Sequence, residues 1–190
     1  MNTIPEDLPT FDAGFPSHEQ IPEIFEIEFH QYMPEKCQMR MNDVFIGAPL
    51  TDSIADPDGY RYHDVFHLAF AAILHWSPVF RALIQQKRRS DKLIDENQDG
   101  GRAIVIEEGL SAWLFSYAKE QKLFSETDKL PLDVLKNIRK FIAGYEVDQC
   151  PAFLWQRSIL EGYKVFRQLS ENNGGTVIGN RKERTIKIKI

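Results

Sequence analysis

Two histidines and an aspartate lie close together in a segment that is otherwise almost entirely apolar. His63, Asp64 and His67 form the pattern His-Asp-Val-Phe-His, which resembles the zincin motif HExxH with Asp in place of Glu. Histidines four positions apart on a helix present their nitrogens to the same ion. The spacing therefore indicates a metal site. A metal-free catalytic or ligand-binding role, and a buried structural pair of histidines, are the alternative interpretations.

Two adjacent carboxylates, Glu107 and Glu108, lie in a second long apolar segment. A buried carboxylate needs a partner, because taking its charge out of water is costly, and the partners available are a cation or the two histidines. We predict that Glu108 joins His63 and His67 as the third metal ligand. Glu107 is predicted to be a catalytic group. The sequence leaves open which of the two glutamates faces the histidines, and whether the other faces solvent.

Asp64 is the second predicted catalytic group. It could act as a general base that activates water, or it could orient a ligating histidine. An exposed aspartate favoured by the helix dipole is the structural alternative. The predicted cofactor is one divalent ion, which could be zinc, magnesium or manganese.

Four arginines are candidates for binding phosphate. Cationic side chains and the free amides of a helix N-terminus both favour anions. The alternative for such a basic cluster is a solvated helix end that complements the macrodipole. The predicted substrate-binding residues are Arg61, Arg88, Arg89 and Arg102.

The two site segments are predicted to be helices over residues 61–75 and 102–121. Apolar side chains surround both of them almost completely, so each helix is expected to be buried on most sides. Further helices are predicted over 77–89, 131–148 and 151–171, and polar loops over 51–59 and 90–101. Strands are predicted as a meander over 24–47 and a hairpin over 176–190.

This order of elements predicts an α+β fold, in which a central bundle of about five helices packs with a small antiparallel sheet of N-terminal and C-terminal strands. Residues 1–35 contain eight acidic residues and no Lys or Arg, whereas 181–190 are basic. We therefore expect the terminal strands to share one sheet, with Glu facing Lys on the solvent side. Charge pairs of this kind select strand register.

The composition limits the class of protein. A chain of 190 residues is expected to form a single domain over 1–190, with residues 1–20 either extended or poorly ordered. The 43% hydrophobic and 12% aromatic content excludes a wholly disordered chain, and no apolar run is long enough to span a membrane. The net charge of -5 argues against a dedicated nucleic-acid surface. Cys37 and Cys150 are expected to be reduced thiols, and the absence of a signal-peptide pattern predicts a cytoplasmic protein.

Several blocks of this sequence resemble the C-terminal domain of MazG-like proteins. The most specific are Asp58–Ala69 (DGYRYHDVFHLA) and the block RAIVIEEG at residues 102–109, and the similarity covers about 11–190. The resemblance implies an association with nucleoside triphosphate pyrophosphohydrolases of the all-α, magnesium-dependent type. In that family the hydrolytic module lies upstream and binds metal through ExxE and ExxD pairs. We find no such module here, and Glu108-Gly-Leu-Ser111 has Ser where ExxD needs Asp. The magnesium site of the hydrolytic module is therefore not assigned to residues of this chain.

We therefore predict a metal-dependent hydrolase that acts on a nucleotide or a related phosphate compound. The alternative is a non-catalytic partner or ligand-sensing domain that serves a separate MazG-like pyrophosphohydrolase. The expected partners are a small nucleotide or phosphate ligand and, in the second case, a protein that carries the hydrolase module. A homo-oligomer is also compatible with the sequence. A third interpretation makes the histidines and glutamates a purely structural network.

Overall fold

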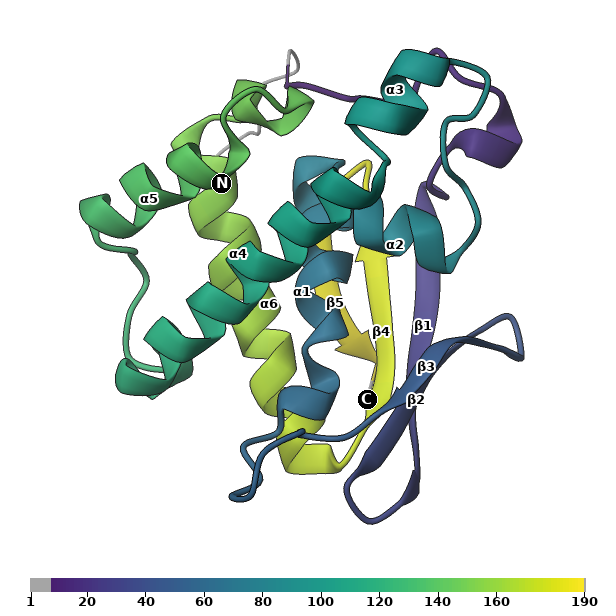
Figure 1. Cartoon of the computed structure of the whole chain (residues 1–190). Coiled ribbons are helices and arrows are strands. Elements are labelled where there is room, and N and C mark those ends of the chain that lie inside the picture. Colours follow the sequence, from purple (N-terminus) through teal and green to yellow (C-terminus); the bar gives the residue numbers. More distant parts are fainter. Residues whose placement is uncertain (1–7, 190) are drawn as a thin grey trace.

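The computed structural model describes residues 8–189. In it, the alternating apolar and polar residues at the two ends of the chain form one antiparallel sheet (Figure 1). The strand order is β3-β2-β1-β4-β5. The predicted α+β fold, the meander and the C-terminal hairpin are confirmed. The strands are β1 (Ile24–Met33), β2 (Lys36–Met41), β3 (Val44–Leu50), β4 (Gly175–Asn180) and β5 (Thr185–Lys189).

The first and last strands lie in the same sheet, but β4 separates them. Phe25, Ile27 and Phe29 of β1 are buried on the face that the helices cover. On the solvent side Glu26 pairs with Lys189 across β4, with 3.2 Å between Oε2 and Nζ. The predicted pairing of Glu with Lys is therefore present. It is exposed, so it contributes little beyond strand register.

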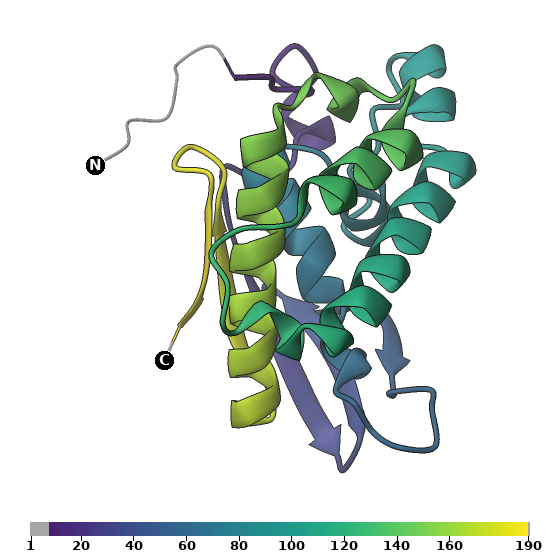
Figure 2. The ribbon, with the colours of Figure 1, turned by 90° about the vertical axis from the view of Figure 1, so that its left-hand side faces the viewer.

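Helices cover one side of the sheet (Figures 1 and 2). Helices α1 and α6 contact β4 and β5, and α4 and α5 pack outside them. None of the described helices is long and apolar enough to cross a bilayer. The bounds are α1 (Asp64–Ala69), α2 (Pro78–Leu83), α3 (Lys92–Asn97), α4 (Gly101–Glu120), α5 (Leu132–Ile142) and α6 (Ala152–Asn172).

Three predicted helix boundaries are wrong. The helix predicted over 61–75 divides into a 3-10 turn, α1 and a π-helical turn over Phe70–Leu74, after which His75 is left-handed (φ 60°). The helix predicted over 77–89 ends at Leu83, and the one over 131–148 ends at Ile142. Tertiary packing decides these ends, and periodicity alone does not report it.

The polar segment predicted as a loop over 90–101 contains α3. The Asp91 carboxylate accepts hydrogen bonds from the backbone N–H groups of Leu93 and Ile94, which is an N-cap. The helix predicted over 102–121 was expected to be buried on most sides, but α4 is buried along one face only. Val105, on its outer side, is 68% exposed. Cys37 and Cys150 are both buried free thiols, as expected.

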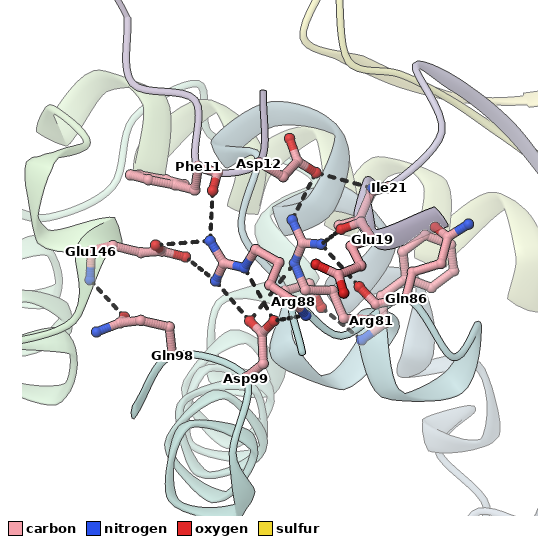
Figure 3. Close-up of polar contacts among 12 residues, drawn as sticks. Phe11, Asp12, Glu19, Ile21, Arg81, Gln86, Arg88, Gln98, Asp99 and Glu146 are labelled. Atoms are coloured by element: carbon pink, nitrogen blue, oxygen red, sulfur yellow. Dashed lines mark hydrogen bonds and ion pairs between the residues drawn. The ribbon is translucent and has the colours of Figure 1, made fainter. Parts of the chain in front are cut away.

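A buried network of arginines and carboxylates joins distant segments near the start of α4 (Figure 3). Asp12 accepts from Arg81 Nη2 (2.7 Å) and from Arg181 Nη2 (2.5 Å). Arg88 forms paired hydrogen bonds with Asp99 and also binds Glu146 (2.6 Å). Bidentate arginine–carboxylate pairs of this kind fix geometry as well as charge.

The network also gives structure to the N-terminal segment, which was expected to be extended or poorly ordered over residues 1–20. Residues 1–7 lie outside the described part of the chain. From Leu8 onward the segment is held through Asp12, whose third hydrogen-bond partner is the backbone N–H of Ile21 (3.0 Å). Ser17–Glu19 forms a 3-10 turn. Burial alone would raise the pKa of Asp12, but Arg181 and Arg81 hold it below its ordinary value.

The first prediction concerns Asp12. Replacing it with alanine removes the carboxylate that two buried guanidinium groups share, those of Arg81 and Arg181. We expect Asp12→Ala to lower the free energy of unfolding by about 3 to 5 kcal/mol. Urea denaturation measures this. The exposed Glu23→Ala is the control, with a change within about 0.5 kcal/mol. An equally small loss in Asp12→Ala would show that the network does not stabilise the fold.

The second prediction concerns His75, which is buried and donates from Nε2 to the backbone oxygen of Arg181 (2.8 Å). Burial, together with the charges of Arg184 and Arg181, lowers its pKa from 6.5 to about 4. Between these values the unfolded chain binds the proton and the folded chain does not. The free energy of unfolding should therefore fall as pH decreases from 6.5 to about 4, by up to about 1.4 kcal/mol per pH unit.

Urea denaturation at several pH values between 4.5 and 6.5 tests this. His75→Gln keeps a side-chain amide donor and should remove that part of the slope. His18→Gln changes a side chain that is largely exposed and should leave the slope unchanged. An unchanged slope in His75→Gln would contradict the prediction.

Candidate functional site

The predicted metal ligands come together where α1 faces α4. His63 precedes α1, His67 lies one turn later, and Glu108 extends from the second turn of α4. One ligand atom from each of these residues lies within 4.8 Å of the others. Among the described residues this is the one group of three or more His, Cys, Asp or Glu side chains that meets such a criterion.

His67 is completely buried and is oriented by a carboxylate. Its Nδ1 donates to Glu107 Oε1 (2.8 Å). Its Nε2 lies 3.4 Å from Glu108 Oε2 but makes no hydrogen bond. Burial alone would lower the pKa of His67, yet the two carboxylates outweigh it and raise the pKa to about 10. In the metal-free protein the ring is therefore protonated at neutral pH, and a metal ion bound between Nε2 and Glu108 would have to replace the Nε2 proton.

His63 is oriented by the backbone. Its Nδ1 donates to the carbonyl oxygen of Tyr60 (2.8 Å), and its ring stacks on the Tyr60 ring with centroids 4.2 Å apart. Within residues 8–189 its Nε2 makes no hydrogen bond, and it lies 3.6 Å from Asp64 Oδ1. The signal for this contact was present in the sequence, because Tyr60 stands one 3-10 turn before His63, but the prediction did not include it.

Both histidines thus use Nδ1–H in a supporting hydrogen bond, which leaves Nε2 as the nitrogen that could face an ion. This is the arrangement of metal-ligating histidines, whose second nitrogen donates to a carboxylate or a backbone carbonyl. Ligands about 2.0 to 2.2 Å from a tetrahedral zinc ion lie about 3.3 to 3.6 Å apart. The 3.4 Å between His67 Nε2 and Glu108 Oε2 fits that spacing. The donor set therefore suits a divalent ion.

Glu107 was predicted to be a catalytic group, and the structure places it among internal partners. Its side chain is inaccessible to solvent. Besides His67, it accepts from the Ser77 hydroxyl (2.7 Å) and from the backbone N–H of Val79 (2.9 Å) at the start of α2. Each of these hydrogen bonds is internal, so Glu107 positions His67 and anchors α2.

Asp64 and Glu108 are the carboxylates that remain accessible at the site. The Glu108 side chain is 41% exposed and that of Asp64 is 13% exposed. Burial alone would raise the pKa of Glu108, but His67 and His63 lower it below its ordinary value. Glu108 is therefore ionised at neutral pH, and Asp64 lies next to the free nitrogen of His63.

The structure does not gather the four predicted phosphate-binding arginines around this site. Arg61 is paired with Asp52 (3.0 Å). Arg88, which was predicted to bind substrate, is buried inside the ion-pair network and is paired with Asp99. Arg89 and Arg102 are exposed. Arg102 begins α4 and stands six residues before Glu108, which is about 9 Å along the helix.

Comparison with known proteins gives one result. The family model described as MazG C-terminal domain matches residues 6–190. No curated protein and no solved structure matched the chain.

The third prediction separates the two glutamates. Glu107→Gln places an amide N–H₂ among the donors of His67 and Ser77, so we expect it to lower the free energy of unfolding of the metal-free protein by about 3 kcal/mol. Glu108→Gln should lower it by less than about 1 kcal/mol, because this side chain is half-exposed. Both should weaken binding of a divalent ion by roughly 10-fold or more.

Thermal and urea denaturation with and without zinc or manganese measure both effects. An ion present at 100 times its dissociation constant should stabilise the unsubstituted protein by about 2.7 kcal/mol. Glu120→Gln, at the exposed end of α4, is the matched control and should behave like the unsubstituted protein. Equal metal-free stability of the two variants, or no stabilisation by any ion, would contradict the assignment.

Proposed function

The chain belongs to the MazG C-terminal domain family, and we propose that it is a metal-dependent hydrolase acting on a nucleotide or a related phosphate compound. The observation that supports this proposal is that Nδ1 of both His63 and His67 is held in a hydrogen bond, while one ligand atom of each lies within 4.8 Å of a carboxylate oxygen of Glu108. A structural histidine pair would use both ring nitrogens internally.

His63, His67 and Glu108 would hold the ion, which when bound supplies a Lewis acid for phosphate oxygens. Asp64 would accept a proton from the attacking water, since it is partly exposed and lies next to a ligand position. Glu107 would keep the His67 ring in place. The supporting groups are already hydrogen-bonded in the protein, so little reorganisation is needed on binding.

The charges around the site also support a role for a cation. Burial raises the pKa of the Tyr60 hydroxyl, and the nearby charges of Glu108, Asp64 and Asp58 raise it further. Lys119 offsets the charge of Asp58, and Arg61 is paired with Asp52, so neither of them offsets Glu108 or Asp64. A phosphate would be repelled by such a site, unless a divalent ion lay between the carboxylates and the phosphate.

The fourth prediction tests the proposed roles. Protein purified without a histidine tag should contain a divalent metal by elemental analysis and should hydrolyse a nucleoside triphosphate. His63→Ala should lose both metal and activity. Asp64→Asn should keep its metal and lose activity by about 100-fold or more, because general-base catalysis contributes at least that much.

Release of phosphate and pyrophosphate from a panel of nucleotides measures the activity. Asp133→Asn, on the exposed surface of α5, is the control and should match the unsubstituted protein. Absence of metal with every ion tried, together with absence of turnover, would reject the proposal. Co-purification with a separate hydrolase under those conditions would favour the alternative role as a partner domain.

A further inference from the structure

A pocket of about 410 Å³ lies between α6 and the segment that joins α4 to α5, and no residue of the metal site lines it. This segment crosses the outer side of α6 (Figure 2), where the backbone N–H of Leu130 donates to Gln156 Oε1 (3.1 Å). The volume is in the range of small-molecule sites.

The wall of the pocket on α6 is basic. Arg157, Lys164 and Arg167 all line it, because positions seven and ten residues apart return to nearly the same side of a helix. Arg157 is neutralised by Glu161 (2.7 Å). Lys164 and Arg167 form no ion pair with any residue from 8 to 189. Two positive charges therefore remain at the pocket, against the single carboxylate of Asp128.

The neutral polar groups of the pocket are mainly donors. Gln156 uses its oxygen for Leu130, so its amide N–H₂ remains available. The Ser125 hydroxyl lines the same space. Arg167 uses one arm of its guanidinium for the carbonyl oxygen of Leu123 and retains its other N–H groups. The donors of Gln156, Ser125 and Arg167 together suit a ligand with several anionic oxygens.

The rim of this pocket is held in a costly conformation. Lys122, Leu123 and Phe124 have φ values of 52°, 52° and 57°, although none of them is glycine. Each such residue costs about 1 to 2 kcal/mol. Arg167 binds the central carbonyl of this turn, and Phe124 anchors it in the core. Backbone strain that the surroundings maintain is typical of functional sites.

We propose that this pocket binds a phosphate-bearing small molecule through Lys164, Arg167, Gln156 and Ser125. Two unpaired cations and two neutral donors match a group that carries at least two negative charges and three or more oxygens. Burial lowers the pKa of Arg167, and Glu171 offsets only part of that effect. A bound anion would stabilise this guanidinium further. The pocket shares no residue with the metal site, so the two proposals can fail separately.

Isothermal titration of metal-free protein with sodium pyrophosphate at low ionic strength tests the proposal. Lys164→Ala should weaken binding by roughly 10-fold, which corresponds to the loss of one charge-assisted contact. Lys136→Ala removes an exposed lysine of α5 and should leave the affinity within about twofold. Arg167→Lys keeps the charge but loses the planar fork, and it should also weaken binding. Glu108→Gln should have no effect.

Several results would overturn this inference. One is the absence of pyrophosphate binding by the unsubstituted protein at millimolar concentration. Another is an equal loss of affinity in Lys164→Ala and Lys136→Ala, which would show that only net charge matters. A loss in Glu108→Gln would show that the anion binds at the metal site instead. Circular dichroism of each variant ensures that a loss of binding is not a loss of folding.

Discussion

A single buried carboxylate, that of Glu107, connects the helices that form the candidate site. It accepts hydrogen bonds from α1 through His67 and from α2 through Ser77 and the backbone of Val79. A carboxylate without access to water is tolerated only when its lone pairs are satisfied, so the three helices must meet at this position. The same contact that satisfies Glu107 fixes the orientation of the His67 ring. Folding and site geometry therefore depend on one group.

The arginine network at the start of α4 has a different role. It joins segments that are far apart in sequence: Asp12 and Arg181 are separated by 169 positions, and Arg88 and Glu146 by 58. Buried ion pairs rarely stabilise a protein more than apolar residues of the same size would. Each charge here has a specific partner, however, and an incorrect arrangement would leave one unpaired. We infer that the network selects this arrangement of segments over other compact ones.

The sequence predicted those features that depend on local pattern. Alternation identified the terminal strands, and the spacing of His63 and His67 with the later Glu108 identified three side chains that the structure brings together. The features that the sequence could not predict depend on tertiary contacts. Glu107 and Glu108 have identical side chains, and only the packing of α4 decides which is buried. Arg88 resembled a surface cation, and its burial follows from Asp99 and Glu146, whose positions no local pattern reports.

The arrangement of the ligands has a consequence for the choice of ion. The two imidazoles are fixed before binding, whereas Glu108 is half-exposed and free to adjust. An ion at this site would meet two nitrogens and one carboxylate oxygen. Magnesium prefers oxygen ligands in a near-ideal octahedron, and zinc and other first-row transition metals bind imidazole more readily. The magnesium dependence that the family resemblance implies applies to sites built from pairs of carboxylates. A site built from His63, His67 and Glu108 would instead favour a transition metal.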